Sequence, residues 1–167
     1  MSSPRIAGLI AFALLLVLPA AQAGAAADTD FERMVICKDS WHDWQRTGDG
    51  HLQKLAAHLS SGYTQKAGDP FFVPKTPTTV LGFRVLQVYP GSVGMGVGFS
   101  ILVDATFDKA RKGLEHTIGK PLQKCETSDG MKTCELQIAA QRTISLMSMD
   151  DPKNTSALLG CYYFYEK

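Results

Sequence analysis

The chain has 167 residues, of which 45% are hydrophobic and 20% are charged, with 17 Lys and Arg side chains against 16 Asp and Glu. This length supports one domain with its own hydrophobic core. The charges balance and form no basic stripe, which argues against nucleic-acid binding and against attraction to an anionic membrane surface.

The N-terminus has the organisation of a secretory signal peptide. One positive charge, Arg5, precedes an uncharged apolar run over residues 6–18, and small residues follow. Ala21-Gln22-Ala23 fits the cleavage motif, and Ala23-Gly24-Ala25 offers a second site. Because the apolar run is shorter than the ~20 residues that cross a membrane, an uncleaved anchor is the weaker alternative.

We therefore expect residues 1–23 to be a signal peptide, residues 24–28 a flexible N-terminus, and residues 29–167 a single domain. The signal is of bacterial style, so the expected location is the periplasm. Loss of Arg5 with the signal leaves a formally neutral chain.

Two helices are predicted in the N-terminal half. In the first, over residues 29–46, apolar side chains recur at roughly helical spacing behind Thr29 or Asp30 as the N-cap. The second covers residues 51–61 with a leucine-rich stripe and Gly62 as its stop. Residues 66–77 contain three prolines, which predicts a rigid loop or an edge strand.

The rest of the chain indicates strands around one helix. This order predicts an α+β fold, an antiparallel sheet of about five to six strands with one helix packed on it and an N-terminal helical region. The expected elements are strands over 78–89 and 93–103 joined by a Pro90-Gly91 turn, a helix over 105–119, a hairpin over 124–136, and strands over 143–149 and 157–165.

The four cysteines of an exported chain are expected to form disulfides. Asp129-Gly130 is a favoured two-residue hairpin loop, and it places Cys125 opposite Cys134. That pair is non-hydrogen-bonded, with Cα atoms about 4.5 Å apart, within reach of a disulfide. We predict Cys125–Cys134 and, by elimination, Cys37–Cys161. A zinc site is the weaker alternative, because the spacing contains no C-x₂-C element.

Four glycines crowd the stretch "GSVGMGVGFSILVD" at residues 91–104. A phosphate-binding loop would need a following Lys-Ser/Thr or a helix directly after it, and neither is present. The odd positions from Val93 to Val103 are all apolar, which predicts a strand.

The opposite face of that strand is bare at Gly94, Gly96 and Gly98, so something is expected to approach it closely. The first explanation is that another part of this protein packs on the glycines. A tight turn at Pro90-Gly91 would pair Phe83 with Gly98 and lay its ring across the glycine. The alternative is a groove for a ligand or a partner.

No motif assembles a catalytic set. G-x-S-x-G and H-E-x-x-H are absent, and paired cysteines leave no free thiol. The histidines, at positions 42, 51, 58 and 116, are interpreted as partly exposed side chains. A hydrolase whose site assembles from distant His and Asp residues stays open as an alternative.

The aromatic residues point to a binding surface. The candidates for partner contact are Trp44 and the consecutive residues Phe71 and Phe72. The loop that holds Phe71 and Phe72 is apolar and braced by prolines, so it loses little entropy on docking. We expect an exported binding protein without catalytic activity, of the inhibitor or immunity type, acting on an envelope enzyme or effector. It would need no cofactor or metal, and would not span the membrane after signal removal. A small-ligand module using the bare glycine face is the alternative.

Overall fold

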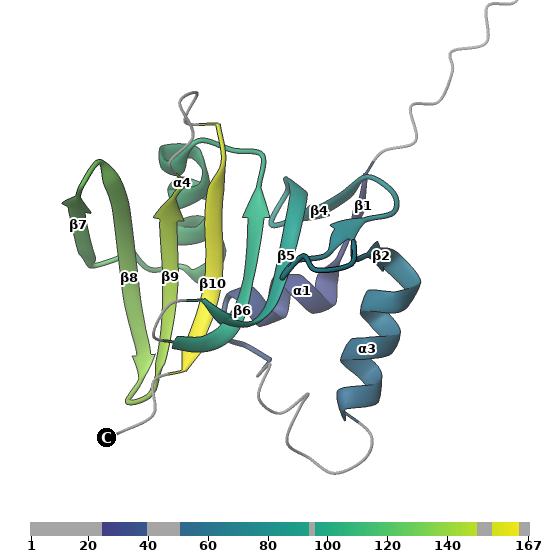
Figure 1. The fold of residues 1–167 in the computed structure, drawn as a ribbon. Coiled ribbons are helices and arrows are strands. Elements are labelled where there is room, and N and C mark those ends of the chain that lie inside the picture. Colours follow the sequence, from purple (N-terminus) through teal and green to yellow (C-terminus); the bar gives the residue numbers. More distant parts are fainter. Residues whose placement is uncertain (1–24, 40–50, 94–95, 150–154, 164–167) are drawn as a thin grey trace, which may run out of the picture.

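The structure is a computed structural model that describes residues 25–39, 51–93, 96–149 and 155–163. It is an α+β domain whose main sheet has eight strands in the order β1-β4-β5-β6-β10-β9-β8-β7, beside a two-stranded sheet of β2 and β3 (Figure 1). The elements are β1 (Ala26–Ala27), α1 (Thr29–Val35), α3 (His51–Gly62), β2 (Tyr63–Thr64), β3 (Val73–Pro74), β4 (Thr78–Val80), β5 (Phe83–Val93), β6 (Gly96–Val103), α4 (Phe107–Ile118), β7 (Lys124–Ser128), β8 (Met131–Ala139), β9 (Arg142–Ser148) and β10 (Ala157–Tyr163).

The predicted class is confirmed, but the expected five to six strands were too few. Neighbouring strands pair antiparallel except β1 and β4, which run parallel and make the sheet mixed. Two helices, α1 and α4, lie on one face of the sheet, where one had been expected, and α3 stands beside β2 (Figure 1).

The core lies between that sheet face and the two helices. It takes Phe99, Ile101 and Val103 of β6 and their neighbours on β10 and β9, as the alternation of the sequence predicts. The largest fully buried side chains are Phe31, Phe99, Met34, Ile101, Leu114, Ile144, Leu146, Leu159, Val35, Val80, Val88 and Val103.

The predicted strand over residues 78–89 divides in two. Leu81 and Gly82 have positive φ values of 54° and 77°, and they make a tight turn between β4 and β5. Left-handed backbone at both central positions is the signature of a hairpin turn that matches the twist of its strands. This division supplies one of the extra strands.

The predicted turn at Pro90-Gly91 is wrong. β5 continues through it to Val93, with Pro90 opposite Phe99 and Gly91 opposite Gly98. The N–H and C=O of Val88 point away from β6, since both bond Phe72. Two residues further on, the nitrogen of Pro90 faces the same way, so its missing N–H removes no bond from the β5–β6 ladder.

The disulfide hairpin is confirmed in register and pairing. Asp129 and Gly130, with φ values of 51° and 81°, form the loop between β7 and β8. Cys125 lies opposite Cys134 with a Cα separation of 4.1 Å and is bonded to it. This short separation is typical of a non-hydrogen-bonded antiparallel pair.

The second predicted disulfide, Cys37–Cys161, is also confirmed, with a Cα separation of 5.2 Å. Helix α1 ends at Val35, and Cys37 follows with a φ of 57°. The chain therefore leaves the helix earlier than its apolar spacing suggested, at the point where Cys37 meets β10. The remainder of the predicted helix, residues 40–46, lies outside the described residues.

The N-terminal segment joins the sheet. Ala26 and Ala27, placed by the sequence in a flexible tail, pair with Thr78 and Thr79 of β4. The predicted signal peptide, residues 1–23, lies outside the described residues. No helix in the described part of the chain is both long and apolar enough to cross a membrane.

Candidate functional site: a braced loop and the polar cluster at its base

The segment of residues 65–77, which we call the 65–77 loop, contains the predicted contact residues Phe71 and Phe72. Phe72 packs against the core and pairs with Val88 of β5. Phe71 is half-buried, and its ring centroid lies 5.7 Å from that of Tyr89. Val73 is 40% exposed. Phe71 and Val73 are thus large apolar side chains of the loop that reach solvent without packing on the core.

Hydrogen bonds hold the loop in place from several sides. Phe72 N–H donates to the carbonyl of Val88 at 2.9 Å, and Val88 N–H donates back at 2.8 Å. The Gln65 side-chain amide donates to the Asp69 carbonyl at 2.8 Å. Strand β3, inside the loop, pairs with β2, which follows α3 directly. The loop therefore has a defined shape before any partner binds.

Lys75 fastens the far end of the loop to the end of α3. Its ammonium donates to the carbonyls of Ser60 at 2.5 Å and Ser61 at 3.2 Å, and its backbone N–H donates to that of Gly62 at 2.9 Å. The last carbonyls of a helix lack intrahelical partners and carry partial negative charge. The Lys75 ammonium therefore supplies hydrogen-bond donors to these carbonyls and also offsets their partial negative charge.

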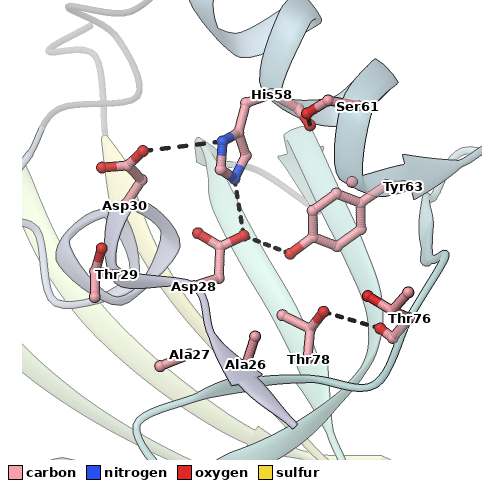
Figure 2. A pocket seen from close by; sticks show the side chains of 11 residues that line it. Ala26, Ala27, Asp28, Thr29, Asp30, His58, Ser61, Tyr63, Thr76 and Thr78 are labelled. Carbon is pink, nitrogen blue, oxygen red and sulfur yellow. Dashed lines mark hydrogen bonds and ion pairs between the residues drawn. The ribbon is translucent and has the colours of Figure 1, made fainter. Parts of the chain in front are cut away.

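Under this end of α3 lies a polar cluster, which we call the Asp28 cluster and which comprises Asp28, His58 and Tyr63 (Figure 2). One oxygen of Asp28, Oδ2, lies 2.8 Å from His58 Nε2 and accepts the Tyr63 hydroxyl at 2.6 Å. The other, Oδ1, accepts the N–H of Phe31 at 3.1 Å and so caps α1. A single carboxylate thus joins α1, α3 and β2.

These contacts shift the ionisation of all three groups. Burial by itself raises the pKa of Asp28, but the hydrogen bonds from His58, Tyr63 and the Phe31 N–H outweigh it and hold the pKa below its usual value. The hydrogen bond to Asp28 raises the pKa of His58 against the opposing effect of burial. Burial, and then the same carboxylate, raise the pKa of Tyr63. The contacts therefore favour the ionised form of Asp28 and the protonated forms of His58 and Tyr63.

A shallow pocket of about 220 Å³ opens beside the cluster. Asp30 lines its wall, with Oδ2 3.9 Å from His58 Nδ1. The wall also carries the hydroxyl-bearing residues Thr29, Ser61, Thr76 and Thr78 (Figure 2). The lining residues are Ala26, Ala27, Asp28, Thr29, Asp30, His58, Ser61, Gly62, Tyr63, Thr76 and Thr78.

A histidine beside an aspartate in a pocket resembles part of a hydrolase site, but the arrangement differs in one respect. A Ser–His–Asp relay needs a hydroxyl on the imidazole nitrogen opposite the carboxylate. Here Asp28 faces Nε2 and Asp30 faces Nδ1 of His58. The Ser61 hydroxyl donates to the backbone carbonyl of His58 at 2.9 Å. The geometry suits a structural ion pair better than nucleophile activation.

The bare glycine face is filled from inside the protein at Gly98. A Cβ added there would lie 2.2 Å from the Cys161 carbonyl oxygen and 3.0 Å from the Tyr162 ring. The expected cover, Phe83, is wrong: because β5 runs on past Pro90, Gly98 faces Gly91, and the Phe83 ring lies against Gly113 of α4.

Of the other predicted site residues, the structure describes the backbone of one and leaves two outside the described residues. Gly96 begins β6 opposite Val93. Trp44 and Gly94 lie outside the described residues. Within the described ranges, no group of three or more His, Cys, Asp or Glu side chains is placed to hold a metal ion.

Sequence reasoning missed the Asp28 cluster. Thr29 and Asp30 were the expected N-caps, whereas Asp28 is the cap, with Phe31 three residues ahead. A signal for the cap did exist, since Asp is a strong N-cap residue and Phe31 starts the apolar stripe. Nothing local marks His58 or Tyr63 as its partners, because they follow 30 and 35 residues later.

Comparisons with the known protein families, with curated proteins and with solved structures found no match to this chain.

Proposed function

We propose that this is an exported, non-catalytic binding protein of the bacterial periplasm, of the inhibitor or immunity type, and that it contacts an envelope enzyme or effector through the 65–77 loop. The observation that carries the proposal is the loop itself. It is bonded to β5, to β2 and to the end of α3, yet Val73 is exposed and Phe71 is partly exposed.

The physical support is preorganisation. Association is opposed by the entropy lost when loops and side chains become ordered. A loop already braced at both ends has little of this entropy left to lose, and a partly exposed aromatic ring is a frequent anchor of protein interfaces. Phe72 packs on the core, so the proposal assigns the contact to Phe71 and its neighbour Val73.

Export is proposed from the N-terminal sequence and from the cysteines. All four cysteines lie in two disulfides, a usage that belongs to oxidising compartments. With residues 1–23 removed, Gly24 and Ala25 would precede β1, so the pairing of Ala26 with Thr78 would be retained.

The test is affinity capture from periplasmic extract with three forms: wild type, Phe71→Ala, and Met131→Ala as a control. Met131 is 43% exposed and lies at the far end of the sheet, on the β7–β8 hairpin, so its truncation removes a comparable apolar side chain from another surface. We expect the same protein to be recovered with wild type and Met131→Ala, and at least tenfold less with Phe71→Ala, the result of losing about 1.4 kcal/mol.

Equal recovery by all three forms would exclude the loop as the contact surface. Matching melting curves for the three forms are required, so that a loss of binding is not a loss of folding.

A further inference from the structure

We propose that the Asp28 cluster is a pH-sensitive clamp that fixes the 65–77 loop in its binding shape in mildly acidic surroundings and loosens it as the pH rises. The inference rests on the proposed function of the loop, since it assigns a regulation to that same surface.

The clamp has one side fixed to the main sheet. Asp28 donates its backbone N–H to the Thr79 carbonyl of β4 at 2.9 Å, and the preceding residues form β1. Its side chain also caps α1, whose Phe31 is fully buried and packs 4.6 Å from the Phe99 ring of β6. The carboxylate is therefore held in position by the core.

The other side of the clamp is the backbone that carries the loop. His58 sits in the last turns of α3, and Tyr63 opens β2 directly after it. Between them lie the three carbonyls that Lys75 binds. Tyr63 also pairs with Pro74 of β3. Any movement of the Asp28–His58 and Asp28–Tyr63 contacts is thus passed to two of the loop's three attachments, those to α3 and β2, and from there along the loop to Phe72 at β5.

The charged groups around His58 decide the direction of the response. Asp28, which precedes α1, lies 2.8 Å from its Nε2, and Asp30 of α1 lies 3.9 Å from its Nδ1. From β2, the Tyr63 ring lies 6.2 Å away, and this phenol stays neutral in the pH range considered. A protonated His58 is attracted by two carboxylates. A neutral His58 can still donate a hydrogen bond to the Asp28 carboxylate, but it loses the ionic attraction to both carboxylates.

The lost attraction matters because, within the described part of the chain, few buried side chains hold the end of α3. Over residues 55–62 of α3 the buried side chains are Leu55 and Leu59, Tyr63 is buried at the start of β2, and Ser60 and Ser61 are exposed. Segments with few buried contacts open locally without global unfolding. Loss of one proton can therefore release the end of α3 and the loop while the eight-stranded sheet persists.

The experiment is residue-resolved amide hydrogen exchange by NMR on the protein with residues 1–23 removed, at pH values from 5.5 to 8.5, with rates corrected for the intrinsic effect of pH. The reporters are the amides of Phe72 and Lys75, which bond β5 and the end of α3. In the wild type we expect their protection to fall about threefold or more as His58 loses its proton, because the ion-pair attraction to Asp28 and Asp30 is lost. Amides of β10 serve as the unaffected reference.

Two variants make the test specific. His58→Gln is neutral at every pH and can still donate to Asp28, so its loop protection is expected to be low and independent of pH. His116→Gln, on the exposed end of α4, is expected to behave as the wild type. The same pH dependence in His58→Gln and in the wild type would overturn the proposal.

A measurement on the wild type alone guards against a misfolded variant. The His58 ring and the two loop amides can be titrated together by chemical shift. Coincident midpoints support the clamp, and separate midpoints reject it. Neither experiment uses a partner, so the clamp can fail while Phe71 still binds, and the capture experiment can fail while the clamp holds.

Discussion

At the scale of single residues, the Asp28 carboxylate makes three contacts that join separate elements. It caps α1, accepts the Tyr63 hydroxyl and pairs with His58. Its side chain is only 7% exposed. Buried charges are tolerated when they are paired and fully hydrogen-bonded, and removing one partner is then costly.

We expect Asp28→Asn to lower the free energy of unfolding by about 1–3 kcal/mol, the usual cost of disrupting hydrogen bonds to a buried charged group. Asn is itself a good N-cap, so the change leaves the α1 cap in place and isolates the loss of charge. Asp30→Asn is the matched control, since Asp30 is 51% exposed and 3.9 Å from the ring. Urea denaturation measures both variants, and equal losses would contradict a special role for Asp28.

The pH dependence of that difference follows from the direction of the two shifts. The pKa of His58 is raised in the folded protein, so its contribution is complete below its ordinary pKa of 6.5 and is lost as pH rises through the folded value. The pKa of Asp28 is lowered, so its contribution is complete above its ordinary 3.8 and is lost as pH falls through the folded value. The stability gap between wild type and Asp28→Asn is therefore expected to be widest between these two pH values.

At the scale of elements, the contact between β6 and β10 explains one of the glycines that the sequence left in question. The Tyr162 ring from β10 lies over Gly98, and the Cys161 carbonyl closes the remaining space. Gly160 of β10 meets the same ring and the backbone of Phe99. The two strands therefore need glycine at these positions because their pairing leaves no room for a side chain. No ligand is required to explain these glycines.

We expect Gly98→Ala to lower the free energy of unfolding by an amount at or above the upper end of the roughly 1–3 kcal/mol typical of overpacking, because its Cβ would meet backbone that cannot rotate away. Gly62→Ala is the control: no atom lies within 4 Å of the added carbon, so its stability is expected to stay within about 0.5 kcal/mol of the wild type or to rise. Thermal and urea unfolding give both values. A harmless Gly98→Ala would show that β10 does not approach β6 this closely.

At the scale of the whole molecule, the two disulfides have different consequences. Cys125–Cys134 closes a hairpin of 9 residues' separation at the edge of the sheet, whereas Cys37–Cys161 spans 124 residues and joins the N-terminal helix to a central strand. A cross-link that closes a longer loop removes more entropy from the unfolded chain.

Replacing both cysteines of a pair by Ala is therefore expected to cost about 3 kcal/mol for Cys125–Cys134 and about 5 kcal/mol for Cys37–Cys161 on the chain-entropy relation. Cys37 and Cys161 are both buried, which adds to the second loss, whereas Cys125 is exposed. Urea unfolding of the two double variants ranks them. The opposite order would show that native packing, rather than loop length, governs their contribution.

Where local chemistry decides the structure, the sequence was sufficient. Asp129-Gly130 specified its turn and hence the Cys125–Cys134 pair, and the alternation from Phe99 to Val103 specified which side chains enter the core. Prediction from the sequence failed where pairing with another strand decides the local structure. Pro90-Gly91 has the composition of a turn, but pairing with Phe99 and Gly98 keeps it in a strand.

The sequence by itself thus determined the class of the fold, the Cys125–Cys134 disulfide and the position of the 65–77 loop, because turn chemistry and side-chain periodicity act over a few residues. The Cys37–Cys161 disulfide followed by elimination, since four cysteines then leave one pair. The tertiary structure alone decided that Tyr162 covers Gly98, and that Asp28 meets His58 and Tyr63. The partners in these contacts come from segments far apart in the chain or from facing strands. Their meeting depends on the packing of whole elements, which no short stretch of sequence encodes.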